Sequence, residues 1–360
     1  MLWIPNSSSE LFTCTGRRVT PVVRPLQQQV ALSVLPQSTL CRELAAIKFR
    51  RWRLCELALQ RLGLPNIGNS CYMNVVLQSL LSLEPFMREV QNQAWTNAMI
   101  FDQTFISWFI RVAKSRLYGD SAEKLSAVSH FKNSIGALNS HFFDDHQKSA
   151  QKCLLTILSS WEGFSTNMKM AASRLGMNYK CPVGTNIAFE ALRSSSCKRC
   201  GWQRKVKSHE VFLSLQTADS VSQALGNVLN ERPADVRCRR CGSHLTDRLS
   251  FSTLPNVLIL SLCRVRRTAS RRFIKVPTAV HLCQDLQVAT LHKEQAQYKL
   301  VTIVNRLGST SHEGHYSCDT MLKDNTPRWL TFDDDKVEVQ PSSLLAERRQ
   351  TALLLFYVKS

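Results

Sequence analysis

Cys71 has the sequence surroundings of a nucleophilic thiol. It follows the turn-rich segment 63–70, which contains Gly63 and Gly68, and it begins a run of apolar residues at helical spacing. The sequence therefore places this thiol at the N-terminus of a helix, where the helix dipole and free backbone N–H groups favour the thiolate. The thiolate is the form that attacks a carbonyl. A small buried residue behind a helix cap is the alternative interpretation.

Two further features of this turn bear on the chemistry. Asn69 or Ser70 is expected to cap the helix that starts at Cys71. Asn66, five residues before the cysteine, carries a side-chain amide that can donate to a developing oxyanion.

A cysteine nucleophile requires a partner base, and His315 is the best candidate among the nine histidines. It lies between two predicted strands, 298–304 and 329–332, and Asp333 and Asp334 come directly after the second of them. Either carboxylate can hold the imidazole by its second ring nitrogen. The order cysteine, histidine, aspartate, with strands between, is the order of a papain-like catalytic arrangement. A structural histidine and a solvated acidic turn are the alternative interpretation.

Four other cysteines form two C-x-x-C pairs, Cys197 with Cys200 and Cys238 with Cys241, and a glycine follows each pair. Four thiolates suit tetrahedral zinc and leave no open coordination position, so we expect a structural zinc ion. The alternatives are free thiols, or a zinc module that binds nucleic acid, since lysine and arginine lie inside the pairs. The absence of interleaved aromatic residues argues against the second.

The composition restricts the fold classes and the partners that are possible. The chain has 360 residues, 46 lysines and arginines, 27 aspartates and glutamates, and a net charge of +19. A hydrophobic fraction of 44% is typical of globular proteins and excludes collagen, coiled coil and wholesale disorder. The positive charge attracts polyanions, so a nucleic-acid partner is possible, although it is not favoured. Apolar runs fall short of the ~20 residues that cross a bilayer, so we expect no membrane partner. We also expect a monomeric chain.

The cysteine count indicates the compartment. Thirteen cysteines in a chain of this length do not form the dense, even pattern of a secreted disulfide scaffold. We therefore expect a reducing compartment, the nucleus and/or the cytoplasm. A mitochondrial transit peptide is the less favoured interpretation of residues 1–40, because no amphipathic helix accompanies their low acidity.

The elements that must position these residues change character along the chain. Residues 1–60 read as a basic, partly disordered N-terminal extension. Helical patterns then cover 71–83, 90–118, 121–138 and 146–161. Strand patterns follow at 211–215, 257–262, 298–304, 329–332 and 352–358. Helices first and strands later predict an α+β fold.

Two segments resemble one known family. Residues 63–78 strongly resemble the Cys box of the ubiquitin-specific proteases, and residues 314–316, 329 and 332–337 resemble their His box. The resemblance extends over about 62–359. Within the family, the segments 181–186 and 308–311 look most like the subgroup of ubiquitin carboxyl-terminal hydrolases 26, 29 and 37.

The resemblance implies a role for each candidate residue. Cys71 would be the nucleophile, His315 the general base and Asp333 the residue that orients it, with Asp334 as a neighbouring support or substitute. Asn66 and the backbone N–H of Cys71 would form the oxyanion hole. The reaction would be hydrolysis of the bond after the C-terminal glycine of ubiquitin through an acyl-thioester, with ubiquitin and ubiquitinated proteins as partners.

It also implies an architecture. The catalytic domain would be 61–359, divided into an α-rich thumb at about 61–175, β-rich fingers at 176–256 and a β-rich palm at 257–359. The cysteine pairs would lie at the tip of the fingers, which would cradle the globular part of ubiquitin.

One segment departs from the family pattern. Many relatives carry an acidic helix start, Q-x-D-A-x-E-F, whose acids face the arginines of ubiquitin's tail. Here the corresponding segment is 144–149, where Asp145 is kept and Lys148 stands at the position of the glutamate. A lysine facing an arginine-bearing tail weakens binding. A catalytically weak, ubiquitin-binding pseudoenzyme is therefore an alternative function, and a basic zinc-containing nucleic-acid binder is a less favoured one.

Overall fold

The computed structural model describes residues 59, 61–93, 105–267, 273–308, 314–322 and 327–360. The predicted extension over 1–60 lies outside these residues, apart from Leu59. The order of elements is helices in the first half and strands in the second, so the α+β prediction is confirmed.

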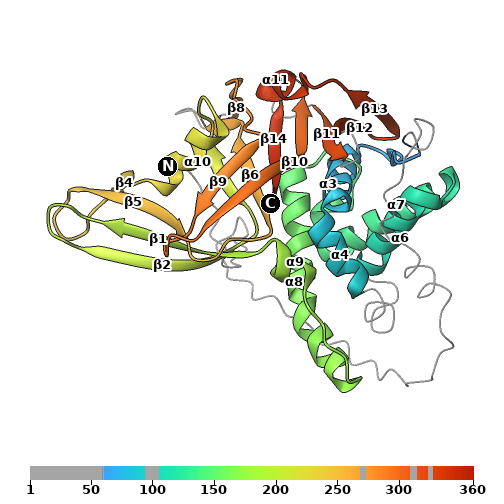
Figure 1. Cartoon of the computed structure of the whole chain (residues 1–360), viewed down its shortest axis with the longest axis horizontal. Helices are drawn as coiled ribbons and strands as arrows, with labels where there is room; N and C mark the ends of the chain where they lie inside the picture. The colour runs from blue at the N-terminus through green and yellow to red at the C-terminus, as the bar shows by residue number, and fades with distance from the viewer. Residues whose placement is uncertain (1–58, 60, 94–104, 268–272, 309–313, 323–326) are drawn as a thin grey trace.

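The described residues of the first half form five longer helices, which lie together on one side of the molecule (Figure 1). They are α3 (Cys71–Ser82), α4 (Glu84–Asn92), α6 (Phe105–Tyr118), α7 (Ser121–Leu138) and α8 (Ala150–Arg174). Shorter helices are η1 (Ser140–Phe142) and α9 (Pro182–Asn186). Aromatic rings hold this part together: Trp161 packs edge-on against Phe86, Phe105 and Phe109 at centroid distances of 5.3, 5.7 and 5.3 Å.

Two predicted helix boundaries are wrong. The pattern over 90–118 is not one helix, because α4 ends at Asn92 and α6 begins at Phe105. The helix expected over 146–161 begins later, at Ala150, because the hydroxyl of Ser149 accepts the backbone N–H of Lys152 as an N-cap. Before it, the carboxylate of Asp144 accepts the backbone N–H of His146 at 2.9 Å, a local turn that competes with helix formation.

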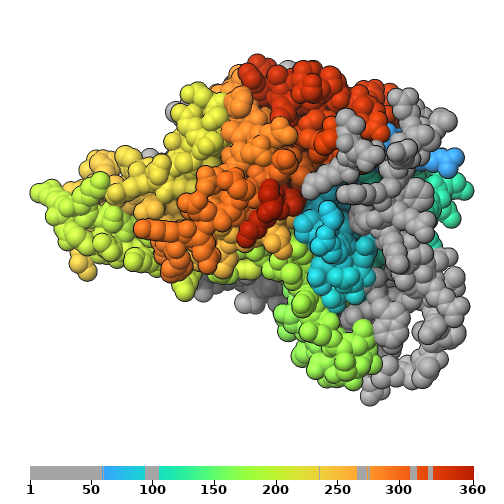
Figure 2. Space-filling model, in the orientation of Figure 1, coloured from blue at the N-terminus to red at the C-terminus, as the bar shows by residue number. Residues whose placement is uncertain are grey.

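The cysteine pairs lie on a four-stranded antiparallel sheet of order β2-β1-β5-β4. Its strands are β1 (Phe189–Ser196), β2 (Gln203–Glu210), β4 (Arg232–Arg237) and β5 (His244–Phe251). One cysteine pair forms the turn between β1 and β2, and the other forms the turn between β4 and β5. This sheet projects as a narrow arm away from the helices (Figures 1 and 2).

The larger sheet has eight strands in the order β13-β12-β11-β10-β14-β6-β3, with β9 also paired to β10. The strands are β3 (Leu213–Gln216), β6 (Val257–Cys263), β9 (Asp285–Ala289), β10 (Gln295–Leu307), β11 (His315–Leu322), β12 (Arg328–Asp333), β13 (Lys336–Gln340) and β14 (Ala352–Lys359). A small hairpin, β7 (Val265–Arg267) with β8 (Phe273–Lys275), and the helices α10 (Val221–Leu229), α11 (Leu344–Glu347) and η2 (Arg348–Gln350) complete the described elements. The strand expected at 211–215 starts two residues later, where Leu213 pairs with Leu260.

Both faces of the eight-stranded sheet are covered. The continuous apolar runs of β6 and β14 are buried along almost their whole length, as expected for strands with packing on both sides. Val304 and Phe356 belong to the core shared with the helices, whereas Tyr298 and Leu355 belong to the core on the side of α10.

Helix α3 joins the helical part to this sheet. Its residues from Cys71 to Leu81 are all buried, which is the pattern of a helix inside a protein. Ser79 contacts Cys318 on β11 at 3.4 Å between Oγ and Sγ, and Ser82 contacts Thr302 on β10 at 2.9 Å between hydroxyl oxygens. The last turn of α3 is thereby held against β10 and β11. None of the helices formed by the described residues has the length and apolarity that a membrane crossing requires.

Candidate active site

The Cys71 thiol lies at the first residue of α3 and is buried. The backbone N–H of Tyr316 donates to its sulfur. The side-chain amide of Gln147 also donates to the sulfur, with 3.9 Å between Nε2 and Sγ. Because Tyr316 is the residue after His315 on β11, the sulfur lies beside the backbone of the predicted base.

His315 and Asp333 form a hydrogen-bonded pair. His315 is the first residue of β11 and Asp333 is the last residue of the adjacent strand β12, so strand pairing sets them side by side. Nε2 of His315 bonds to Oδ1 of Asp333. A ring nitrogen held in this way leaves Nδ1 as the nitrogen that can take the thiol proton. The structure thus pairs His315 with Asp333 from two adjacent strands, and Cys71 lies near the backbone of Tyr316, the residue that follows His315.

Asp334 contacts a different set of residues. It has a left-handed backbone with a φ of 54°, and its carboxylate accepts from Nδ2 of Asn66 and Nδ2 of Asn74, each at 2.8 Å. Its backbone carbonyl accepts the N–H of Leu64 at 2.9 Å. These contacts are those of a neighbouring support for the Cys71 turn, and the role predicted for Asp334 stays a prediction. Asn74 was missed by the sequence reasoning, although it lies within the Cys box, three residues after the thiol.

Both the nitrogen and the oxygen of the Asn66 side-chain amide form hydrogen bonds. Nδ2 donates to Asp334, and Oδ1 accepts the backbone N–H of Ser70 at 3.1 Å. An amide nitrogen carries two hydrogens, so one of them remains to donate to an oxyanion. The geometry is compatible with the predicted oxyanion-hole role, which it does not test.

The expected side-chain cap on α3 is absent. Ser70 is the N-cap residue, but it makes no side-chain cap hydrogen bond. Its hydroxyl accepts the N–H of Ile67 at 2.9 Å, inside the preceding turn. Asn69, with a φ of 47°, instead donates from its side chain to the carbonyl of Asp145 at 2.8 Å. The N-cap hydroxyl therefore does not occupy the N–H groups of the first turn, where Cys71 needs a donor for an oxyanion.

The Cys71 thiol has a pKa above its ordinary value. Burial is the largest cause, and the negative charge of Asp334 acts in the same direction. The donors from Tyr316 and Gln147 oppose the shift without cancelling it. The thiol is therefore protonated at neutral pH and needs a base to become a nucleophile, which is the role predicted for His315.

Gln147 links the two halves of the site, and the sequence reasoning did not single it out. Its Oε1 accepts the backbone N–H of Gly314 at 3.1 Å, while its Nε2 reaches the Cys71 sulfur. The segment before α8 is thereby connected to the start of β11 across the thiol.

Each acidic side chain of the segment 144–149 forms an ion pair with a lysine. Lys148 contacts Asp144 at 2.6 Å, and only 7% of the Lys148 side chain is exposed. This hydrogen bond holds the pKa of Asp144 below its usual range. Asp145 forms an ion pair with Lys132. Both carboxylates of the segment are therefore compensated by a lysine, and the position assigned to Lys148 in the family pattern stays a prediction.

A cavity of about 430 Å³ lies between the start of α8 and the large sheet. Gln147 and Tyr316, two of the residues that donate to the Cys71 sulfur, form part of its wall. The other lining residues come from the start of α8 and from the large sheet and the residues that follow β6: Lys148, Ser149, Gln151, Cys263, Arg264, Val265, Arg306 and Leu353. The cavity is large enough for several residues of an extended peptide.

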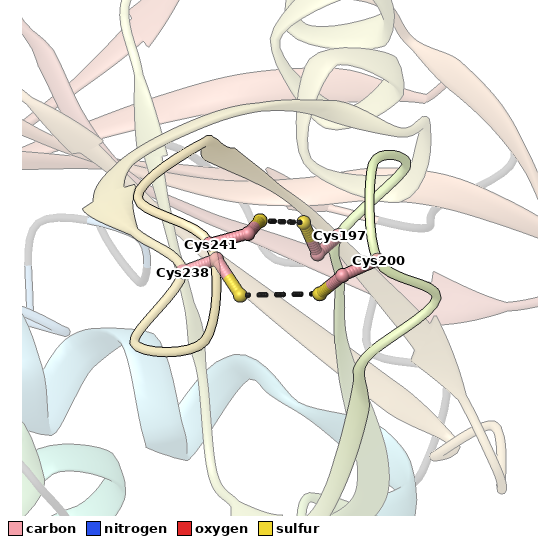
Figure 3. A group of neighbouring side chains, drawn as sticks. All are labelled: Cys197, Cys200, Cys238 and Cys241. Carbon is pink, nitrogen blue, oxygen red and sulfur yellow. Dashed lines mark hydrogen bonds between the residues drawn. The ribbon is translucent and has the colours of Figure 1, made fainter.

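The four cysteines of the C-x-x-C pairs converge at the end of the four-stranded sheet (Figure 3). The sulfurs of Cys197 and Cys241 are 3.4 Å apart, those of Cys200 and Cys238 are 3.6 Å apart, and all four lie within 4.8 Å of one another. All four are free thiols. Thiolates at ~2.3 Å from a tetrahedral zinc ion are about 3.8 Å apart, so the donor set fits zinc.

The backbone conformation explains why a glycine follows each cysteine pair. Gly201 and Gly242 both have a φ of 70°, a left-handed conformation that favours glycine. Their N–H groups donate to the carbonyls of Cys197 and Cys238, each at 2.9 Å. The two turns are thus built alike, and each one folds its two sulfurs toward the same point.

The fold and the cysteine–histidine–aspartate geometry define a papain-like cysteine protease of α+β type. The family model described as ubiquitin carboxyl-terminal hydrolase matches residues 62–357, and the chain belongs to this family. The thumb, fingers and palm of the expected architecture correspond to the helical part, the four-stranded sheet and the eight-stranded sheet. The exact subdomain limits stay a prediction.

Individual relatives support the subgroup that the sequence suggested. Ubiquitin carboxyl-terminal hydrolase 37 of Homo sapiens is 28% identical over 227 residues, which are 56% of this chain and 23% of the relative. Hydrolase 26 of Homo sapiens is 27% identical over 229 residues, covering 56% of this chain and 25% of the relative. Hydrolase 23 of Arabidopsis thaliana is 25% identical over 315 residues, which cover 82% of this chain and 35% of the relative. The match thus spans 23–35% of the length of these relatives.

A solved structure gives the same fold. Ubp8 in the SAGA deubiquitinating module bound to ubiquitin aldehyde superposes with a TM-score of 0.68 at 19% identity, over 89% of this chain and 74% of that chain. At this identity the likeness establishes the fold, and the function must be argued from the site.

Proposed function

We propose that the chain is a deubiquitinating cysteine protease, which hydrolyses the bond after the C-terminal glycine of ubiquitin through an acyl-thioester. The observation that carries the proposal is the position of the Cys71 sulfur, which accepts the N–H of Tyr316 directly beside the His315–Asp333 pair. Family membership supplies the class of substrate.

The geometry supports a specific catalytic role for each residue. His315 takes the thiol proton, and the Cys71 sulfur attacks the carbonyl carbon of the terminal glycine. The backbone N–H of Cys71 and the side chain of Asn66 stabilise the oxyanion, and His315 returns the proton to the departing amine. His315 then activates the water that hydrolyses the thioester. Asp333 keeps the imidazole oriented throughout, through its bond to Nε2.

Zinc at Cys197, Cys200, Cys238 and Cys241 would be structural. When bound, the ion would join the two hairpin turns and stiffen the end of the fingers, since four thiolates leave it no open position for substrate. The distances between the sulfurs and the repeated turn geometry support this assignment.

Ubiquitin and ubiquitinated proteins are the proposed partners. We also propose that the protein acts in a reducing compartment, the nucleus and/or the cytoplasm. All ten described cysteines are free thiols, which supports that compartment.

The test combines a probe and a substrate. A ubiquitin probe with a C-terminal electrophile should form an adduct at Cys71, and a ubiquitin C-terminal fluorogenic amide should be hydrolysed. Cys71→Ala and His315→Ala should abolish both reactions. Cys283→Ala is the control, because Cys283 is a partly exposed free cysteine that lies outside the site, so both reactions should persist. Reaction at another cysteine, or turnover by Cys71→Ala, would reject the proposal.

A pseudoenzyme is the second candidate function, favoured by the pairing of Lys148 with Asp144 where relatives carry acids. Ubiquitin affinity without adduct formation or turnover would indicate this function. A nucleic-acid binder would show neither ubiquitin reaction and would instead bind RNA or DNA with a steep dependence on salt.

A further inference from the structure

The end of the four-stranded sheet carries a concentration of positive charge. The two cysteine turns and the strand residues beside them, 197–209 and 236–246, contain eight lysines and arginines and no aspartate or glutamate. The convergence of the four cysteine sulfurs within 4.8 Å of one another brings these two segments together (Figure 3). The eight residues form the fingertip patch, and all of their side chains are exposed: Lys198, Arg199, Arg204, Lys205, Lys207, Arg237, Arg239 and Arg240.

Among the described side chains, few negative charges offset the fingertip patch. Glu231 forms an ion pair with Lys198, with 3.5 Å between Oε1 and Nζ. Asp247 lies in register with Arg232, which is outside the patch, so these two charges offset each other. A zinc ion held by four thiolates would add two negative charges at the cysteines. Eight cations against the two charges of a filled cluster and the one of Glu231 leave an excess of about five positive charges.

The stability of the sheet does not account for all of this charge. Strand β2 lies at the edge of the sheet, and lysines on an exposed edge disfavour pairing with other chains, which explains Lys205 and Lys207. Arg239 and Arg240 lie instead in the turn between β4 and β5, where no strand edge needs protection. A filled zinc cluster has a charge of about −2, which far fewer than eight cations would balance. The remaining charge is therefore available to a partner.

The fingertip patch lies at the free end of the narrow arm that the four-stranded sheet forms (Figures 1 and 2). The arm projects away from the helices, so α3 with Cys71 lies on the other side of the molecule (Figure 1). A large polyanion can therefore contact the two protruding turns without covering the thiol.

The fingertip patch has no exposed aromatic platform between its cations. Trp202 is the only tryptophan, tyrosine or phenylalanine in the two segments, and it is partly buried against the small core that includes Cys197 and Leu245. Proteins that bind single strands stack the bases on aromatic rings, whereas contacts to a duplex backbone require only charge and hydrogen-bond donors. Five of the eight cations are arginines, whose planar guanidinium groups match the geometry of phosphate. These features favour a duplex over a single strand.

We propose that the fingertip patch binds the phosphate backbone of a nucleic-acid duplex without reading its base sequence. Phosphate contacts supply affinity that is independent of sequence, because every base pair presents the same charges. A chain bound in this way is held by the end of its arm, and the side of the molecule that contains Cys71 stays open to substrate. The inference goes beyond the proposed hydrolase function and does not depend on it.

The test measures the binding of the full, zinc-loaded chain to a short fluorescently labelled duplex by fluorescence anisotropy. We expect the logarithm of the association constant to fall linearly with the logarithm of the salt concentration, with a slope of about −4, as four or five phosphate contacts require. Duplexes of unrelated base sequence should bind equally well. A duplex DNA and a duplex RNA of the same length distinguish the two sources of this backbone, and binding of either one supports the inference.

Charge variants assign the binding to the fingertip patch. The double variant Arg239→Gln with Arg240→Gln should weaken duplex binding about tenfold and make the salt slope less steep by about 2. Lys198→Gln with Arg199→Gln, made separately on the other turn, should have the same effects, so the conclusion does not depend on one variant folding. Zinc content and Tm, measured for both, show whether the two turns stay intact.

The matched control removes the same charge from another part of the chain. Lys169 and Arg174 are exposed on α8, outside the four-stranded sheet. The double variant Lys169→Gln with Arg174→Gln should therefore keep the affinity and the salt slope of the unaltered chain.

Three results would overturn the inference. The first is the absence of duplex binding, or an equal loss of binding in the fingertip variants and the control, which would place the contact elsewhere on this basic chain. The second is tighter binding of a single strand of the same length. The third is tighter binding of an acidic polypeptide of equal charge, which would indicate a protein partner. Hydrolysis of ubiquitin amides does not enter these measurements, so the inference and the proposed function fail separately.

Discussion

The amide of Asn66 donates to the carboxylate of Asp334 at 2.8 Å, so the predicted oxyanion donor is fixed by a charge that also acts on the nucleophile. The same carboxylate accepts from Asn74, on the first turn of the helix that begins at Cys71. Asp334 thus orders the turn around the thiol while it disfavours the thiolate. The two effects can be separated by experiment.

Replacing Asp334 should make Cys71 easier to deprotonate. A negative charge near a thiol raises its pKa, so Asp334→Asn should lower the pKa of Cys71, while the new amide oxygen still accepts from Asn66. The measurement is the rate of alkylation by iodoacetamide as a function of pH, whose midpoint should move to lower pH. Asp335→Asn, at the exposed neighbouring residue, is the control. An unchanged or higher midpoint would show that the charge of Asp334 does not reach the sulfur.

Replacing Gln147 should have the opposite effect. Its amide hydrogen bond lowers the pKa of Cys71, so Gln147→Ala should raise that pKa and move the alkylation midpoint to higher pH. Gln151→Ala, made at another glutamine of the cavity wall, is the control, because Gln151 is not among the groups that shift the thiol. A midpoint at lower pH in Gln147→Ala would contradict the assigned contact.

Asp333→Asn should slow turnover much more than it weakens binding. An amide in place of the carboxylate no longer favours the tautomer and orientation of His315, and loss of acid–base catalysis costs ~10²–10⁴-fold in kcat. Steady-state kinetics on the fluorogenic amide should show KM nearly unchanged. If Asp333→Asn keeps full activity and Asp334→Asn is inactive, the orienting role belongs to Asp334.

Removal of zinc should loosen the fingers and leave the thiol chemistry intact. Cys238→Ser should lower the zinc content measured by elemental analysis, and it should lower the Tm, because metal binding contributes to folding. Iodoacetamide should still alkylate Cys71 at its original rate. Cys283→Ser, at a free cysteine outside the cluster, should change neither zinc content nor Tm. Equal zinc content in both variants would rule out the four-cysteine site.

His209 should make the contact between fingers and thumb depend on pH. Burial opposes its charged form, but hydrogen bonds to Glu190 on β1 and Glu162 on α8, at 2.9 and 2.8 Å, raise its pKa overall. A raised pKa stabilises the fold fully below the ordinary histidine value of ~6.5, and the stabilisation is lost as pH rises through the folded-state value. The Tm difference between the unaltered chain and His209→Gln should therefore be largest at acidic pH. A difference that grows with rising pH would reverse the assignment.

Local sequence patterns were sufficient to predict part of the secondary structure around the site. The helix start at Cys71, the helix Ser121–Leu138 and the strand that ends at Asp333 follow from periodicity and turn residues, since these depend on neighbours in sequence. The strand β11, which begins at His315, was not predicted. The Cys-box and His-box motifs identified the family. Periodicity did not locate the break between α4 and α6, because the apolar pattern continues across it.

The contacts that tune the site were decided by the tertiary structure. Asp334 with Asn66, Gln147 with Cys71 and Gly314, and the cavity wall between α8 and the large sheet all join segments distant in the chain. Which side chains meet there depends on strand order, register and the docking of α3 and α8 on the sheet. Residue types and their local spacing do not specify those relations, because the energy of each contact is realised only after the chain has packed.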